Sequence, residues 1–162
     1  MSSPKLDLTQ EERNSLRKGK IRLSDLASQT AAELSRTTGI AVRRCRELVS
    51  LAQFQTLGSV GLESARDLLA LGFVDLEGLK QGDPVEMYDR LKSRSGGQLD
   101  PCVEDVFRCA IAQAQDPHLS SEFLKWWLWS PCRGESSIRV PVAVVDRRRA
   151  IPSDVVLSRV HC

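Results

Sequence analysis

The chain has 162 residues, of which 41% are hydrophobic and 27% charged, and its net charge is +2. This balance excludes a disordered chain and allows one compact domain or two small ones that share a core. Because no run of about 18 apolar residues occurs and the N-terminus lacks the apolar core of a signal peptide, we expect a soluble cytoplasmic protein with no membrane partner.

Charged residues are distributed unevenly along the chain. The net charge is +4 over residues 1–50, −5 over residues 51–130 and +3 over residues 131–162. We therefore expect a polyanion to approach the two ends of the sequence and not its middle.

The five cysteines include no C-x-x-C pair, which fits neither a disulfide framework nor a zinc ribbon, so we expect reduced thiols and no metal.

Helix-start signals recur from the N-terminus onward. Thr9, Thr30 and Asp83 each precede a glutamate by three residues, which is the spacing of a capping box. Pro84 directly follows Asp83, as expected of a proline in the first turn of a helix. Apolar residues at three- and four-residue steps predict a further helix over residues 101–115, and no strand-like alternation occurs before residue 135. These signals predict a mainly helical protein.

Two segments of the sequence are related by an internal repeat. IRLSDLASQTAAEL, from Ile21, aligns with VDLEGLKQGDPVEM, from Val74, at a separation of 53 residues. The leucine before the loop, the capping residue and the apolar residue four positions later coincide in the two segments. We therefore expect two related helix-loop-helix units.

Two stretches are predicted to form turns between helices. LGSVGLESA, residues 57–65, has two glycines in what would otherwise be one helix, and each costs about 1 kcal/mol relative to alanine there. GIAVRRC, residues 39–45, aligns with SVGLESA and has Ile40 where the later stretch has Val60. This spacing resembles the helix-hairpin-helix signature, in which a tight turn joins two short helices.

Such a turn can hold a phosphate against the unpaired backbone N–H groups at the start of its second helix. These contacts read the nucleic-acid backbone and carry no base information. The candidate DNA-phosphate-binding residues are Gly39, Ile40, Ala41, Arg43, Arg44 and Arg46 at the first turn, and Gly58, Ser59, Val60 and Gly61 at the second.

Each turn departs from the signature at one glycine. Ala41 replaces the second glycine of the first turn, and Ser59 replaces the first glycine of the second. Since serine tolerates a positive φ less well than glycine, we expect the second turn to differ in shape or to be closed to phosphate, unless the hydroxyl caps the next helix. Three arginines follow the first turn, where a solvated arginine face is the alternative to a phosphate contact. For the second turn the alternative is helix packing or contact with a partner.

Residues 57–129 resemble the pathogenicity-locus helix-hairpin-helix family, some members of which are called mitomycin resistance proteins. The similarity rests on LGSVGLESARDLLALGFVDLEGLKQGDPVEMYDRL, then DPCVEDVFRCAIAQA, then FLKWWLWS. The preceding residues resemble the related domain that accompanies tandem helix-hairpin-helix repeats. The resemblance implies an all-helical fold and a link to nucleic acid, with DNA repair or stress resistance as the context. It supplies no catalytic residue.

The tryptophans near the end of this region have two interpretations. Trp126, Trp127 and Trp129 are expected to seal one end of the helical core, and the alternative is a stacking platform for an unpaired base. Residues 131–162 combine valines, prolines and the triplet Arg147–Arg149, which predicts a weak hairpin or an extension.

The predicted fold class is all-α, with tandem helix-hairpin-helix units in a compact helical domain and an irregular or weakly β C-terminal extension. The predicted domains are an N-terminal helix-hairpin-helix-like unit over residues 1–52, a pathogenicity-locus-like domain with a Trp-rich end over residues 53–130, and a basic extension over residues 131–162.

The function that follows is non-catalytic and sequence-independent binding of DNA through backbone phosphates, with no cofactor. The alternative is a protein interaction module whose hairpins serve helix packing and contact with a protein partner. An enzyme is the weakest option because the chain has only two histidines and no glycine-rich nucleotide loop. Asp100, Glu104 and Asp105 are interpreted as helix-start charges on a solvated face.

Overall fold

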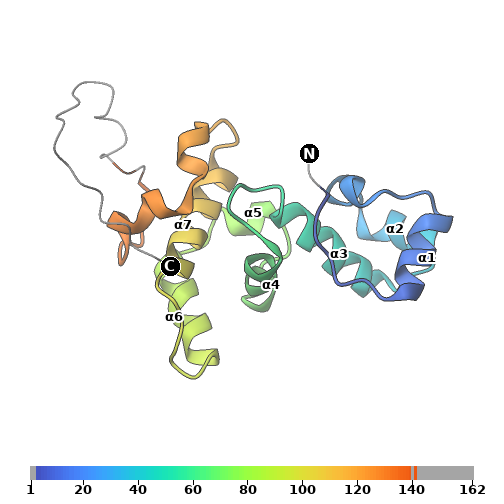
Figure 1. The fold of residues 1–162 in the computed structure, drawn as a ribbon, viewed down its shortest axis with the longest axis horizontal. Helices are drawn as coiled ribbons and strands as arrows, with labels where there is room; N and C mark the ends of the chain where they lie inside the picture. The colour runs from blue at the N-terminus through green and yellow to red at the C-terminus, as the bar shows by residue number, and fades with distance from the viewer. Residues whose placement is uncertain (1–2, 140, 142–162) are drawn as a thin grey trace.

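The computed structural model describes residues 3–139 and 141, and these residues are helical, with no strand among them. Figure 1 shows α1, α2 and α3 at one end of an elongated molecule, and α6 and α7 toward the other. The predicted all-α class is confirmed. The extension predicted as irregular or weakly β over residues 131–162 has no strand in its described residues 131–139 and 141, and its remaining residues lie outside the described part. The α-helices are α1 (Gln10–Lys18), α2 (Ala31–Thr38), α3 (Val42–Phe54), α4 (Leu62–Ala70), α5 (Leu76–Leu79), α6 (Pro84–Arg94) and α7 (Cys102–Gln115). The 3-10 segments are η1 (Leu23–Ser28), η2 (Ser121–Leu124) and η3 (Trp126–Cys132).

The helix starts predicted from capping residues are confirmed. The Thr9 hydroxyl accepts a hydrogen bond from the Glu12 amide at 3.1 Å, and the Glu12 carboxylate accepts one from the Thr9 amide at 2.9 Å. Thr30 and Asp83 cap α2 and α6 through amides of the first turn. Each cap supplies an acceptor to backbone N–H groups that have no partner within the helix.

One apolar core extends from the N-terminal segment to α7. Leu26 and Leu79, which the predicted repeat aligns, are both fully buried in it. The next aligned pair, Leu34 and Met87, is buried as well. The aligned positions are therefore buried in both units. Burial of the leucine on one side of each loop and of the apolar residue on the other side holds the two ends of the loop against the core.

Segments η2 and η3 pack against α7 and close one end of the core. Trp129 is fully buried, and its indole N–H donates to the Phe123 carbonyl oxygen at 3.0 Å. Its ring meets the Phe123 ring edge-on, with the centroids 6.5 Å apart. Trp126 is half-buried and Trp127 is exposed. The predicted sealing role is thus confirmed for Trp129 and not for Trp127.

Cys45 and Cys109 are free and lie in the core as small apolar residues, as their helical positions predicted. Cys102 is disulfide-bonded, so the expectation of reduced thiols is wrong for this residue. Burial raises the pKa of the Cys109 thiol to about 11, despite hydrogen bonds that act in the opposite direction. The thiol is therefore protonated at neutral pH, and its sulfur bonds only to neighbours inside the fold, among them the Phe123 carbonyl oxygen.

The interpretation of the acidic residues near the start of α7 as solvated charges is wrong for Glu104 and Asp105, which are buried, whereas Asp100 is exposed. The Glu104 carboxylate accepts hydrogen bonds from Arg108 Nη2 at 2.7 Å and from the Gly134 amide at 2.8 Å. The Asp105 carboxylate binds the Arg133 guanidinium, whose Nε donates at 2.9 Å. These two carboxylates fasten the chain that follows η3 to α7, and their arginine partners compensate for the loss of water.

Arg44 attaches the N-terminal segment to α3. Its Nε lies 2.7 Å from Glu12 Oε1, and its Nη2 donates to the Asp7 carbonyl oxygen at 2.7 Å. The hydrogen bond from Arg44 lowers the pKa of Glu12 below its ordinary value, and the hydrogen bond from the Thr9 amide contributes in the same direction. Because the folded state holds the Glu12 proton less tightly than the unfolded chain, this stabilisation is present at neutral pH and is lost as the pH falls through the lowered pKa.

Replacing Glu12 by glutamine is expected to lower the free energy of unfolding at pH 7 by about 1–2 kcal/mol, because the charged hydrogen bonds to Arg44 are weakened. At a second, acidic pH the difference from the wild type should shrink, because the wild-type carboxylate becomes protonated as the pH falls through the lowered pKa of Glu12. Urea unfolding at both pH values measures it. The control is Glu11→Gln on the same helix, whose side chain is exposed. Equal effects of the two variants at pH 7 would contradict the assigned role of Glu12.

Candidate nucleic-acid interface

The two predicted turns have the same backbone conformation at their first residue. Gly39, between α2 and α3, has φ 74°, and Ser59, before α4, has φ 68°. The N-cap residues that follow, Ala41 and Gly61, are extended, with ψ values of 135° and −174°. The expectation that serine gives the second turn a different shape is therefore wrong at this residue. Ser59 adopts the left-handed conformation at a cost of about 1–2 kcal/mol that a glycine would not bear.

The apolar positions of both turns point into the protein. Val60 is buried, and Ile40 is half-buried against the same core. Cys45 and Ala65, the small residues that end the two aligned stretches, are fully buried. This packing explains the shared spacing, since the apolar and small residues hold the start of each second helix against the core.

Helices α3 and α4 begin without a side-chain cap. Neither Ala41 nor Gly61 offers an acceptor to the first-turn amides, and both residues are exposed. Side chains cap α1, α2, α5 and α6, and at α7 the Asp100 carboxylate accepts from the Cys102 amide at 2.8 Å. Within the described part of the chain, α3 and α4 are thus the α-helices whose first-turn N–H groups lack a side-chain acceptor. Such amides carry partial positive charge and favour an anion.

The three arginines after the first turn have different environments. Arg43 is 91% exposed in its side chain, and its Nε lies 4.0 Å from the Glu47 carboxylate, which is a weak surface pair. Arg46 is exposed. Arg44 is bound inside the fold by Glu12, Glu47 and the Asp7 carbonyl oxygen. The structure therefore presents Arg43 and Arg46 to solvent beside the turn and withdraws Arg44 from it.

The second turn is fastened to η2 and α7. The Ser59 hydroxyl donates to the Leu124 carbonyl oxygen and accepts from the Trp126 amide at 3.3 Å. It therefore does not cap α4, which corrects that alternative. The Gly58 amide donates to the Gln113 side chain at 2.6 Å, and that side chain donates back to the Gly58 carbonyl oxygen at 2.9 Å. A Cβ on Gly58 would lie 2.9 Å from the Leu124 Cβ, so glycine is required by this close approach.

The charges beside the second turn are paired with one another. Glu63 and Asp7 both bind the Arg66 guanidinium. Burial raises the pKa of the Asp67 carboxyl, and the charge of Glu63 adds to this effect. The second turn therefore has little free positive charge, as its sequence predicted, whereas the first turn has exposed arginines.

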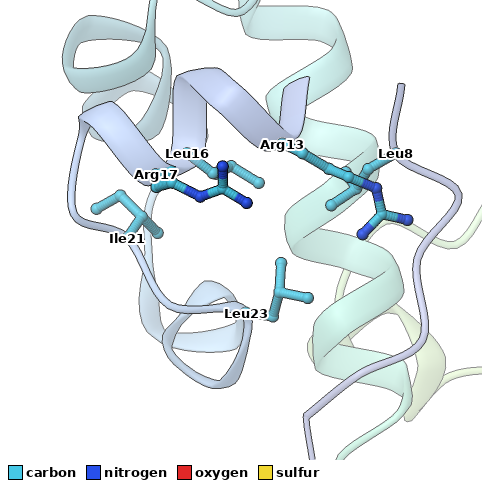
Figure 2. Close-up of a pocket in the computed structure, with 6 residues that line it drawn as sticks. All are labelled: Leu8, Arg13, Leu16, Arg17, Ile21 and Leu23. Atoms are coloured by element: carbon cyan, nitrogen blue, oxygen red, sulfur yellow. The ribbon is translucent and has the colours of Figure 1, made fainter. Parts of the chain in front are cut away.

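A pocket of about 260 Å³ lies between α1 and the segment that leads into η1. Figure 2 shows the two arginines of α1, Arg13 and Arg17, among apolar side chains from α1 and the surrounding segments. Neither arginine forms an ion pair with another described residue. The sequence analysis missed this pocket, although the four-residue spacing of the arginines places them on one face of a helix. Its apolar lining consists of Leu8, Leu16, Ile21 and Leu23.

Residues 3–139 and 141 contain no group of three or more His, Cys, Asp or Glu side chains arranged to hold a metal ion. Over the same residues, no helix has the length and apolar character needed to cross a membrane.

Comparisons with known proteins match a region of the chain that includes the second turn and not the first. Residues 47–135, more than half of the chain, match the family described as pathogenicity locus. The chain is 35% identical over 78 residues to a mitomycin resistance protein of Streptomyces lavendulae, and the aligned residues make up 48% of this chain and 70% of that protein. No solved structure matches the chain. The matched family region includes the second turn and the carboxylates Glu104 and Asp105, and it begins after the first turn.

Two substitutions of Ser59 distinguish the stabilisation from its hydroxyl hydrogen bonds from the strain of its left-handed backbone conformation. Ser59→Ala is expected to lower the free energy of unfolding by about 1–2 kcal/mol, because it loses both hydrogen bonds and keeps the left-handed φ. Ser59→Gly should cost less, since glycine adopts that φ without strain. Urea denaturation of the two variants beside the wild type measures the difference. A glycine variant less stable than the alanine variant would show that the left-handed conformation is not the strained element.

Proposed function

Because the chain belongs to the pathogenicity locus family, we propose that it is a non-catalytic helix-hairpin-helix protein that binds DNA without sequence preference through backbone phosphates. The observation that carries this proposal is the pair of turns with a left-handed first residue, each followed by a helix without a side-chain cap. A phosphate at these positions would accept hydrogen bonds from amides that lack a side-chain acceptor.

The first turn has the features that phosphate contact requires. A Cβ built on Gly39 has no atom within 4 Å, so the turn is open on that side. Arg43 and Arg46 follow within the first turns of α3, where their charge adds to that of the amides. Residues 1–50 also have a net charge of +4. We therefore assign the main phosphate contact to Gly39, Ala41 and the amides after them, with Arg43 and Arg46.

The second turn contributes differently. Its glycine and serine are engaged by α7 and η2, yet Gly61 is exposed and has nothing within 4 Å of a Cβ built on it. The amides at the start of α4 therefore remain open to an anion, while the neighbouring acidic residues weaken the attraction. In this proposal the second turn is the weaker phosphate contact and also an internal anchor.

The cytoplasm, expected from the sequence, is the proposed location of this activity. A context in stress resistance is proposed from the name of the S. lavendulae relative, which is called a mitomycin resistance protein.

A protein interaction module is a second candidate, favoured by the pocket beside α1. Its apolar lining and the guanidinium groups of Arg13 and Arg17 suit an apolar, acidic segment of a protein partner. The two candidates are separated by a pull-down with nuclease treatment. Loss of all captured protein after nuclease favours DNA binding alone, whereas a partner that stays bound and is released by Arg13→Glu favours the interaction module.

Replacing Arg43 and Arg46 together by glutamate is expected to weaken binding to random-sequence duplex by at least about tenfold, because two phosphate contacts are lost and like charges face the backbone. The plot of log affinity against log salt concentration should become less steep, with the magnitude of its slope reduced by about 2. Fluorescence anisotropy at several salt concentrations measures both quantities.

The matched control for the arginine variant is Arg90→Glu with Lys92→Glu on α6, which changes the net charge by the same amount. Its effect on duplex affinity should be smaller because α6 does not take part in the proposed contact. Equal losses in the two double variants would assign the effect to overall charge and not to the first turn.

Replacing Ala41 by aspartate tests the uncapped helix start directly. The new carboxylate is expected to cap α3 and to raise the free energy of unfolding by about 1 kcal/mol. It also occupies the amides and repels phosphate, so duplex affinity should fall. Thermal unfolding and anisotropy measured on the same preparation report the two effects. A variant that is more stable and binds duplex as tightly as the wild type would exclude the α3 amides as the phosphate site.

A further inference from the structure

An exposed tryptophan lies beside the second turn. Trp127 is 53% exposed, whereas Trp129 is fully buried and Trp126 is half-buried. Among the described residues, Trp127 is the one exposed side chain of the Phe, Tyr and Trp type. Leaving a large ring in water forgoes the free energy that its burial would provide, so the packing of the helical core does not account for Trp127.

Two neighbours define the surroundings of the Trp127 ring. The Trp126 ring meets it edge-on, with the centroids 5.7 Å apart and the planes at 90°. The Lys125 ammonium lies 6.0 Å from the centroid of the Trp127 ring. The ammonium lies over the ring, so an exposed aromatic ring, on which a base can stack, is combined with a charge that attracts the adjoining phosphate.

The position of this pair is fixed by the second turn. The Ser59 hydroxyl binds the carbonyl oxygen of Leu124 and the amide of Trp126, so the backbone on both sides of Lys125 is held on the turn. Ser59 lies two residues before Gly61, where the uncapped helix α4 begins. The α4 amides, which favour a phosphate, and the Trp127 ring, which favours a base, therefore belong to segments that are bonded to each other through Ser59.

We propose that Trp127 and Lys125 form a stacking site for an unpaired nucleobase next to the second turn, so that the favoured nucleic acid is a duplex with a single-stranded end. This inference rests on the proposed DNA binding and adds the form of DNA that is bound. Bases inside a duplex have both faces covered by their neighbours, whereas an unpaired base in a single-stranded end can turn a free face to the ring. The anchoring of residues 124–126 by Ser59 then acquires a role in recognition, because it sets the ring against the turn.

The test compares two labelled DNAs that share one duplex sequence, one blunt and one with a short single-stranded oligothymidine overhang. Fluorescence anisotropy with the full chain gives the ratio of the two affinities. We expect the overhang DNA to bind about 5- to 100-fold more tightly, which is the range for stacking of one base on an aromatic side chain. Trp127→Ala should bring this ratio close to one, and Trp127→Phe should retain part of it.

The control is Val74→Ala, which also removes an exposed apolar side chain and should leave the ratio unchanged. Because Trp127 is exposed, its variants are expected to fold, and thermal unfolding checks this. Lys125→Gln should reduce the ratio most at low salt, where the attraction of its charge for the phosphate is least screened.

The outcomes distinguish this inference from the proposed function. Duplex binding with equal affinities for blunt and overhang DNA would overturn the stacking site and leave the proposed function standing. A ratio that persists in Trp127→Ala would also overturn the stacking site. Absence of binding to either DNA would remove both. Binding of overhang DNA alone, lost in Trp127→Ala, would support the stacking site and reject the duplex backbone contact.

Discussion

The backbone N–H groups at the start of every helix need acceptors, and the way this protein supplies them organises the rest of its structure. Thr9, Thr30, Asp75 and Asp83 each place an oxygen at a helix start. The two helices that follow the turns begin instead at alanine and glycine, which have no side-chain acceptor. A side-chain cap stabilises a helix by about 1 kcal/mol, and α3 and α4 lack this interaction. An anion bound to their first-turn N–H groups would stabilise these helices in the same way.

The two turns share one backbone conformation and use it in different ways. At the first, Gly39 is open to solvent and the exposed arginines follow it, while Arg44 turns inward to hold the N-terminal segment. At the second, Gly58 and Ser59 bond to α7 and η2, so the turn is also the anchor of the Trp-rich end. One backbone conformation therefore leaves its groups open at the first turn, where phosphate contact is proposed, and joins parts of the fold at the second, because the surrounding side chains decide which groups stay free.

Prediction from the sequence succeeded where the interacting groups are close in the chain. Caps act over three residues, and the stripe of α7 repeats at three- and four-residue steps, so both could be recognised from spacing alone. Prediction failed where the partner is distant. Asp105 was interpreted as a solvated charge because Arg133 lies 28 residues away. Capping of α4 was left open as an alternative role for the Ser59 hydroxyl because its acceptor, Leu124, lies 65 residues away.

The sequence by itself determined the helical class, the capped helix starts at Thr9, Thr30 and Asp83, and the two turns. Local hydrogen bonds and the helical repeat explain this success, since both depend on neighbours in the chain. The residues of the phosphate site stay a prediction. Only the tertiary structure decided which members of that site face solvent. In the folded chain Arg44 is bonded to Glu12, whereas Arg43 and Arg46 are exposed. Trp127 is exposed and Trp129 is buried. The physical reason is that exposure and ion pairing depend on which distant segments pack together, and the packing of the core decides this for each side chain.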